Sequence, residues 1–383
     1  MRITTPAWTP DSGATLAVAL EVLLHGPISR SDIARRLDLS PGSLTRLSTP
    51  LIESGLLVEL DERSETPRAG RPSRPLDVVA DSRHFVGMKL TGADLRAVVT
   101  DLRANVVAEE SMQLTSQEPR AVARQVGELV SSVSRGLPTP TAVGIGIGGL
   151  VADHGTVRSA PFLGWEDVPL GSMVEHETDL PVVIENDVVA FTEAQHWFGV
   201  GRGLDRFAVI TLGAGVGYGL VIHGDVVVDG DSGLGLVGHW PLDPFGPVCP
   251  AGHRGCARSV LTSTAISQAV SAAVGRVVDY PEALQLASSG DSAALRVVDD
   301  AGRALGRLIA AVANLTAAER IVLGGEGIGL TDVAADAIRE GIALDRDPRA
   351  RTPDLVSTSG DDSQWCRGAA VIAIQRFVLG KRS

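Results

Sequence analysis

Between residues 14 and 60, apolar residues recur every three or four positions, the spacing of helices that bury one face. A stripe of leucines runs from Leu16 to Leu24 and ends at the Gly26-Pro27 pair. Two shorter stripes follow, each after a serine that can cap a helix, Ser29 and Ser40. "LLVEL" at 56–60 and "PLDVV" at 75–79 predict short strands joined by a charged, Pro- and Gly-rich loop. Three helices followed by such a hairpin predict a winged helix-turn-helix domain at residues 1–80.

From residue 81 the pattern changes to alternating strands and helices. "HFVGMKLTGADLRAVVTDLRANVVAEE", from residue 84, predicts three strands joined by tight turns, and the segment from residue 206 repeats it about 120 residues later. Apolar strands ending in glycine loops recur at 141–157 and 319–329. We therefore predict an α/β fold with two related lobes, residues 81–200 and 201–364. A C-terminal helix at 365–383 is expected to pack on the first lobe.

Composition and charge narrow the class of protein. The chain has 383 residues, 44% of them hydrophobic, a mean hydropathy of +0.17 and a net charge of −12. It shows neither a signal peptide nor an apolar run of membrane-spanning length, and three cysteines are too few for a disulfide framework. We expect a cytoplasmic protein without membrane contact. The acidic balance disfavours broad nucleic-acid affinity, so any DNA contact must be local.

The predicted helix-turn-helix offers such a local surface. The third helix leaves a face of serine, threonine and arginine uncovered, and these side chains suit phosphates and base edges in a major groove. "AGRPSRP" in the predicted wing forms a positive strip suited to phosphates or a minor groove. The candidate DNA contacts are Arg30, Ser40, Ser43, Thr45, Arg46, Arg71 and Arg74. Two alternatives stay open: a helical bundle for protein contacts, and arginines that are merely solvated.

A carboxylate stands at the end of a predicted strand. In "VVIENDVVAF", residues 182–191, β-branched residues lead into Glu185-Asn186-Asp187 and an apolar stretch follows. The C-terminal end of a strand is a common place for a general base. Asp187 is therefore either a working base or a remnant of an active site that has lost its chemistry.

These residues together resemble the ROK family (repressors, open reading frames and sugar kinases) over essentially the whole chain. The resemblance is carried by Glu185-Asn186-Asp187, "GAGVGYG" at 213–219, Gly238-His239, the segment from Cys249 to Cys256, and Gly324-Gly325. It implies an actin-like (ribonuclease H-like) fold with two lobes that close on a sugar and, in kinases, on ATP. It also makes Asp187 the counterpart of the family's general base. The helix-turn-helix arm is typical of the repressor branch.

The first phosphate loop departs from the family pattern. Kinases of the family carry Asp-x-Gly-Gly-Thr after the first strand, where this chain has Lys89-Leu90-Thr91-Gly92-Ala93. Backbone NH groups can cradle phosphate only where glycine lets the loop approach closely. The second loop is better preserved, with Ala214 where threonine is usual. Phosphoryl transfer depends on positioning and charge stabilisation, so we expect no kinase activity.

The sugar pocket implied by the resemblance has also changed. Phe162 stands where the family has asparagine, and Leu236 and Arg258 stand where it has glutamates. Three interpretations stay open: an anionic ligand that Arg258 would suit, an oligosaccharide that stacks on Phe162, or no ligand. The candidate ligand residues are Gly149, Phe162, Asn186, Asp187, Leu236, His239 and Arg258.

The resemblance further implies a zinc site built from one histidine and three cysteines. His239, Cys249 and Cys256 match the pattern, but Ala251 replaces the middle cysteine. Structural zinc takes four ligands in a tetrahedron, and His253 is placed to supply the fourth. The alternative is an empty loop with free thiols.

The sequence thus predicts a regulator rather than an enzyme. We expect a repressor that binds operator DNA at an inverted repeat. A carbohydrate-derived effector is expected to release it from the DNA. Repression follows from the resemblance alone. A homodimer or homotetramer is expected, because a two-fold partner can bind the second half-site. The alternatives are an ATP-dependent sugar kinase with an accessory DNA-binding arm and a DNA-binding protein that responds to no ligand.

Overall fold

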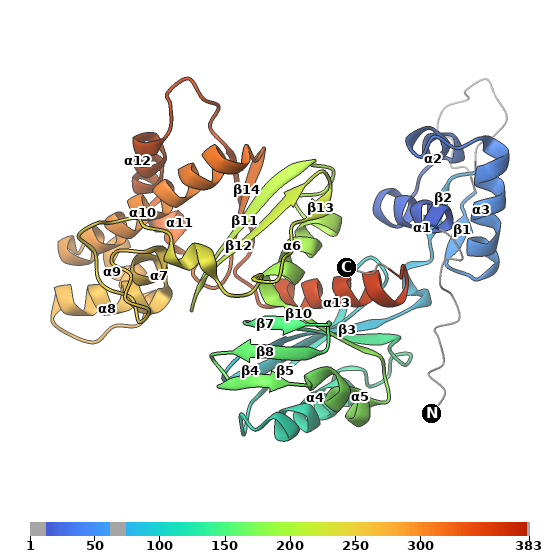
Figure 1. Ribbon diagram of the computed structural model, residues 1–383, viewed down its shortest axis with the longest axis horizontal. Coiled ribbons are helices and arrows are strands. Elements are labelled where there is room, and N and C mark those ends of the chain that lie inside the picture. Colours follow the sequence, from blue (N-terminus) through green and yellow to red (C-terminus); the bar gives the residue numbers. More distant parts are fainter. Residues whose placement is uncertain (1–12, 62–73, 381–383) are drawn as a thin grey trace. The chain divides into compact units, whose positions relative to one another are not determined.

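The computed structural model describes residues 13–61 and 74–380, and Figure 1 shows their arrangement along the chain. The chain forms two compact units. The first unit ends at Ala190 and resumes at Trp365, and Phe191–Gln364 form the second. The second unit is therefore an insertion into the first.

The N-terminal part of the first unit is a winged helix-turn-helix, as predicted. Its elements are α1 (Gly13–His25), α2 (Arg30–Arg36), α3 (Pro41–Glu53), β1 (Leu57–Glu59) and β2 (Leu76–Val78), with β1 and β2 antiparallel. Ser29 and Ser40 cap α2 and α3. The side chain of each accepts a hydrogen bond from the backbone NH of the residue three positions later. The buried face of α1 differs in part from the predicted leucine stripe. Val18 and Val22 are buried with Leu23, whereas Leu16 and Leu20 are partly exposed.

The α/β part of the first unit is built on a five-stranded sheet in the order β10-β6-β3-β4-β5. After the short helix η1 (Ala80–Ser82) come β3 (Phe85–Leu90), β4 (Asp94–Thr100), β5 (Val106–Gln113), α4 (Pro119–Val133) and β6 (Ala142–Ile147). A three-stranded sheet, β7 (Leu150–Ala152), β8 (Thr156–Ala160) and β9 (Trp165–Val168), precedes α5 (Leu170–Thr178) and β10 (Val182–Asn186). The C-terminal helix α13 (Ser363–Phe377) packs closely on β3, where Gly87 leaves room for its backbone.

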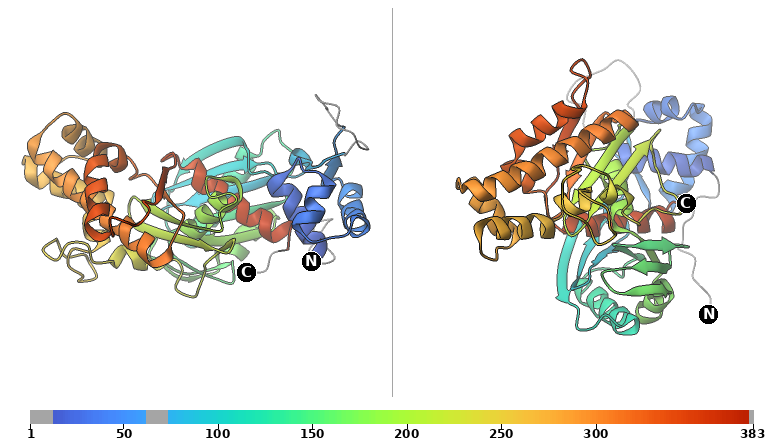
Figure 2. Two further views of the ribbon diagram at one scale, coloured as in Figure 1. Left: turned by 90° about the horizontal axis from the view of Figure 1, so that it is seen from above. Right: turned by 60° about the vertical axis from the view of Figure 1, so that its left-hand side comes forward.

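The second unit has a five-stranded sheet in the order β13-β12-β11-β14-β15. Its strands are β11 (Arg206–Leu212), β12 (Val216–Ile222), β13 (Asp225–Val226), β14 (Arg320–Gly324) and β15 (Asp354–Ser357). Its helical elements are η2 (Leu236–His239), α7 (Ala257–Leu261), α8 (Ser263–Val274), α9 (Tyr280–Ser288), α10 (Ser292–Thr316), α11 (Leu330–Val333) and α12 (Ala335–Asp345). Figure 2 shows α10 and α12 side by side, and Gly306 and Gly341 let their backbones approach.

Both main sheets have the same topology. In each, the first three strands are antiparallel neighbours, and the first strand also pairs in parallel with the fourth, which pairs in parallel with the fifth. The repeat predicted from the sequence pattern is therefore a repeat of topology. Helix α6 (Asp187–Phe198) begins in the first unit and continues into the second beyond Ala190.

Candidate functional site

Asp187 lies where a parallel strand becomes a helix. It is the first residue of α6, directly after β10. Asn186 fixes this junction: its amide nitrogen donates to the carbonyl of Gly149 over 3.0 Å, and its oxygen accepts from the backbone of Val188 and Val189. Asn186, which is predicted as a ligand contact, is buried, and these hydrogen bonds hold it next to Asp187. The half-buried Asp187 carboxylate stands at the N-terminus of α6, where the helix dipole favours negative charge.

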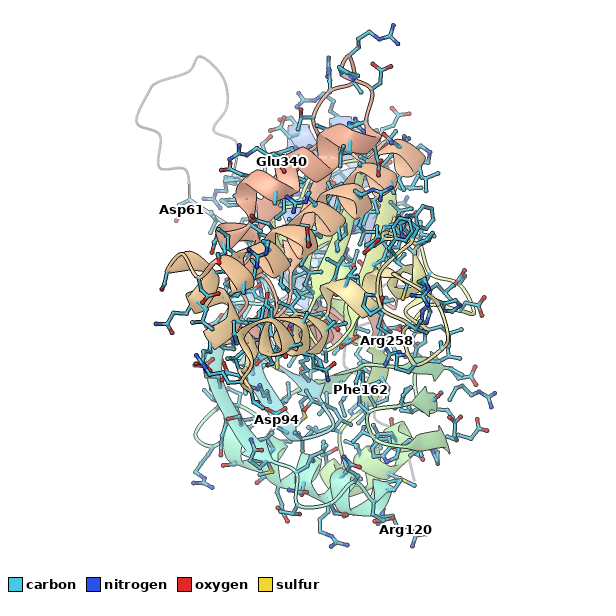
Figure 3. All side chains as sticks on the ribbon, turned by 90° about the vertical axis from the view of Figure 1, so that its left-hand side faces the viewer. Asp61, Asp94, Arg120, Phe162, Arg258 and Glu340 are labelled. Atoms are coloured by element: carbon cyan, nitrogen blue, oxygen red, sulfur yellow. The ribbon has the colours of Figure 1, made fainter. Side chains whose placement is uncertain are left out.

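A glycine pair and an exposed aromatic ring lie beside Asp187. A Cβ atom on Gly148 would lie 3.6 Å from the Oδ2 atom of Asp187 and 3.8 Å from the ring of Phe162. Gly149 is packed against the backbone of Ser159, where a Cβ atom would have no room. Phe162, labelled in Figure 3, belongs to the segment that connects β8 to β9, and it is 53% exposed. Four of the predicted ligand residues therefore gather at one place in the first unit.

The turn after β3 is closed by its own side chains. The hydroxyl of Thr91 accepts from the backbone NH groups of Ala93 (3.2 Å) and Asp94 (2.9 Å), and it also donates to the Asp94 carboxylate. Lys89, in place of the family's acidic residue, is buried, with its ammonium 4.1 Å from the ring centre of Trp365. Two NH groups of the first predicted phosphate loop are thus already paired.

The turn after β11 is closed from a distant part of the chain. The backbone NH of Ala214 donates to the Oε1 atom of Glu326 over 2.8 Å. Glu326 is not among the residues predicted for the site. The available signal was a carboxylate directly after Gly324-Gly325, at the end of an apolar strand.

The candidate metal loop runs from η2 to α7 in the second unit. Two isolated β-bridges, Pro241 with Cys256 and Val248 with Arg254, fold it back on itself. The backbone NH of Cys249 donates to the carbonyl of His253, which closes a tight turn. Ala251, at the position of the family's middle cysteine, is exposed.

This loop gathers three of the four predicted ligands, His239, Cys249 and His253, and brings the fourth, Cys256, close to His239. The Nδ1 atom of His239 lies 3.8 Å from the sulfur of Cys249, 4.0 Å from that of Cys256 and 3.0 Å from the Nδ1 atom of His253. Tetrahedral zinc, with bonds of about 2.0–2.3 Å, places pairs of ligand atoms roughly 3.3–3.8 Å apart. His239, Cys249 and His253 lie close enough together to hold a metal ion.

The protonation states also suit a metal. Burial raises the pKa of the Cys249 thiol, but hydrogen bonds with the backbone at His253 and Ala251 outweigh it and bring this pKa to about 7. Burial lowers the pKa of His239, and its electrostatic interactions with His253 and Arg258 lower it further. A thiolate and a neutral imidazole are the forms that bind metal.

The remaining predicted ligand residues belong to the second unit. Leu236 begins η2 and is 60% exposed, and His239 ends it. Arg258 lies exposed in α7, close enough for its charge to act on His239. The predicted ligand residues therefore form two groups, one in each unit.

The predicted DNA contacts differ in their availability. Thr45 and Arg46 are exposed on α3, while Ser40 and Ser43 hydrogen-bond to each other at its start. The guanidinium of Arg30 donates to the hydroxyl of Ser48 and forms an ion pair with Glu59, both within the same domain.

Two arginines of the predicted wing complete this set. Arg74 lies 3.9 Å from Glu59 and 3.6 Å from Asp61. Arg71 lies outside the described residues. Within the described ranges, no helix is long and apolar enough to cross a membrane.

Three features define the class of protein: two units of one topology, a carboxylate at the start of α6, and a helix-turn-helix arm. Together they are typical of an actin-like α/β protein that carries a helix-turn-helix domain. The sequence profile of the ROK family matches residues 85–376. The chain belongs to the ROK family.

Named relatives include both regulators and a kinase. The chain is 28% identical over 374 residues to the N-acetylglucosamine repressor of Escherichia coli O6:H1, covering 93% of this chain and 91% of the relative. It is 33% identical over 263 residues to a glucokinase of Thermotoga maritima, covering 62% and 82%. Its fold is similar to the crystal structure of a ROK family transcriptional regulator described as a homologue of the E. coli Mlc protein. That match has a TM-score of 0.82, 26% identity and 95% and 96% coverage.

Proposed function

We propose that this protein is a transcriptional repressor that binds operator DNA and is released by a carbohydrate-derived effector. The observation that carries the proposal is the winged helix-turn-helix arm, with Thr45 and Arg46 exposed on α3, on a ROK domain. The similarity to a ROK transcriptional regulator extends over 95% of the chain and therefore includes this arm. A repressor named for N-acetylglucosamine is similar over 93% of the chain, which supports a sugar derivative as effector.

The effector's contact in the first unit centres on Asp187. Its carboxylate lies beside Gly148 and Phe162, so a polar ligand group could meet the carboxylate while a ring packs on the aromatic face. Because α6 starts at Asp187 and continues into the second unit, a ligand bound there touches an element that both units share. A ligand that favours one state of this element by a few kcal/mol can change operator occupancy.

Zinc is the metal that we propose for the His239, Cys249, His253 and Cys256 cluster. Its donors are two imidazoles and two sulfurs, a set typical of structural zinc. Bound there, the ion would hold the loop from η2 to α7 in shape. A homodimer or homotetramer that binds an inverted repeat is proposed on the ground that one arm contacts only a half-site.

The experiment is operator binding followed by fluorescence anisotropy. The DNA is the region upstream of the protein's own gene, at stated salt, titrated with sugars, amino sugars, sugar acids and oligosaccharides. We expect Asp187→Asn to raise the effector concentration for half-release about tenfold, because a charge-assisted hydrogen bond contributes about 1.5–3 kcal/mol. Operator affinity without effector should stay within about twofold.

A matched variant controls for the loss of one negative charge. Asp179 is exposed at the end of α5 with a positive φ angle, which asparagine also adopts readily. Asp179→Asn should leave effector release unchanged. Loss of operator binding by a folded Asp187→Asn protein would contradict the proposed role.

A second candidate function is a sugar kinase with an accessory DNA-binding arm. It is favoured by the similarity to a glucokinase and by Asp187 at the position of the family's base. It is opposed by the paired NH groups in both predicted phosphate loops. Thermal unfolding with Mg-ATP distinguishes the two functions: a kinase is stabilised by several degrees, and the proposed repressor is not.

A further inference from the structure

The two glycine loops of the second unit lie next to each other. Strands β11 and β14 are parallel neighbours with Thr211 opposite Gly324, so the loops that follow them leave the same edge of the sheet. The backbone NH of Gly327 donates to the carbonyl of Leu212 over 2.8 Å and joins these loops directly. Gly325 has a φ of +92° and is packed against Leu212, so the second loop turns sharply at the end of the first strand.

This arrangement puts the Glu326 carboxylate onto the loop that follows β11. Its Oε1 atom accepts the Ala214 NH over 2.8 Å. A Cβ atom on Gly213 would lie 2.1 Å from the same oxygen, so the carboxylate occupies the space that this glycine leaves open. At Gly215, by contrast, a Cβ atom would meet nothing within 4 Å.

The chemistry of such a loop normally favours an external anion. Backbone NH groups of glycine turns at the ends of parallel strands bind phosphate, because glycine permits close approach and the NH dipoles attract negative charge. Here the same position holds a carboxylate from within the chain. A phosphate arriving at Ala214 would have to displace this carboxylate and then remain beside a like charge.

We propose that Glu326 is a specificity-determining residue that excludes nucleotide phosphates from the loop at residues 213–215. The exclusion has two parts: the carboxylate takes the Ala214 NH, and its charge repels a polyphosphate. The inference deepens, and rests on, the proposed absence of kinase activity, and it names the residue responsible in the second unit. It makes no use of operator binding.

The test compares binding of a fluorescent ATP analogue, in the presence of Mg²⁺, to the full-length wild type and to Glu326→Gly. We expect the variant to bind at least about tenfold more tightly, since it regains both the free NH and the absence of like charge. Inorganic triphosphate should displace the analogue from the variant. Glu326→Gln, which keeps an acceptor oxygen but loses the charge, should fall between the two proteins.

The matched control is Glu319→Gln. Glu319 is an exposed glutamate just before β14, at the opposite end of that strand from Glu326. It should bind the analogue as weakly as the wild type. Tight binding by the wild type, or no gain by a folded Glu326→Gly protein, overturns the inference. If Glu326→Gly fails to unfold cooperatively, Glu326→Gln decides, and unchanged binding there overturns it.

Anisotropy with operator DNA, run on the same proteins, separates this inference from the proposed function. If the effector releases operator DNA normally but the Glu326 variants bind nucleotide no better than the wild type, only the proposed role of Glu326 is contradicted. If the variants bind nucleotide more tightly but none of the proteins binds DNA, the proposed repressor function is contradicted and the role of Glu326 is supported.

Discussion

The turns that follow the first strand of each sheet occupy the same place in the same topology but are closed differently. In the first unit, Thr91 binds NH groups two and three residues ahead of it. In the second unit, Ala214 is bound by Glu326, 112 residues away. The first closure is a property of a short segment. The second exists only because β11 and β14 are neighbours.

This difference separates two ways in which the NH groups of a turn can be paired within the chain. A local closure forms whenever the turn forms, so it needs no tertiary contact. A long-range closure depends on the sheet, so it is as stable as the packing that holds the strands together. The comparison between the units can be sharpened by perturbing each of them separately.

The largest expected difference concerns metal. Among the described residues, the His/Cys group that could hold an ion belongs to the second unit. A ligand present at 1,000 times its Kd stabilises the state that binds it by about 4 kcal/mol. Chelation should therefore destabilise the second unit by about that amount and leave the first unchanged. Hydrogen exchange of peptides from each unit, with zinc or with chelator, measures this.

Two buried cysteines provide the matched pair for this experiment. Cys256 is a proposed ligand, whereas Cys366 lies in α13 of the first unit, where its thiol donates to the carbonyl of Arg96. Cys256→Ser should abolish the response to zinc, and Cys366→Ser should preserve it. Equal loss of protection in both units on chelation would show that the ion does not act locally.

The next effect concerns helix-to-sheet packing. A Cβ atom on Gly87 would lie 2.0 Å from the carbonyl oxygen of Cys366 in α13, whereas one on Gly219 would lie 2.0 Å from the Thr192 hydroxyl. A backbone atom cannot rotate away, so Gly87→Ala should lower the free energy of unfolding by about 3 kcal/mol. Gly219→Ala should cost about 1 kcal/mol, because a side chain can adjust. Urea unfolding of both variants gives the values, and equal losses would refute this account.

The smallest effect tests the turns themselves. Thr91→Val removes the acceptor of two NH groups in a partly buried turn and should cost about 1 kcal/mol. Glu326→Gln keeps an acceptor at an exposed site and should change stability by less than about 0.5 kcal/mol. The same urea titrations compare them. A larger loss for Glu326→Gln would mean that the long-range closure carries more stability than the local one.

Much of the fold could be predicted from the sequence because its signals are local or repeated. Serine caps and helical spacing marked the three helices of the arm, and the hairpin pattern recurring after about 120 residues marked the paired sheets. The inner face of α1 was partly missed. The prediction used the leucines alone, but the segment also contains valines at helical spacing. The face that is buried includes Val18 and Val22.

The site was predictable where one segment determines it. Asp187 stands at the strand-to-helix junction that "VVIENDVVAF" indicates, and His253 lies 3.7 Å from Cys249 in a five-residue turn. Partners distant in the sequence were not predictable. Arg30 is bound by Ser48 and Glu59, and Ala214 by Glu326, because tertiary packing brought them together.

The insertion of one unit into the other has a consequence for synthesis of the protein. On the ribosome, residues 191–364 are complete before α13 has been made, so the inserted unit can fold while its host lacks a helix. Gly87 in β3 and Gly144 in β6 leave room for the backbone of α13. Until α13 has been made, the faces of β3 and β6 that it covers stay exposed in the nascent chain. Translation that stops at Gln364 would release a chain whose second unit is complete and whose first unit still lacks most of α13.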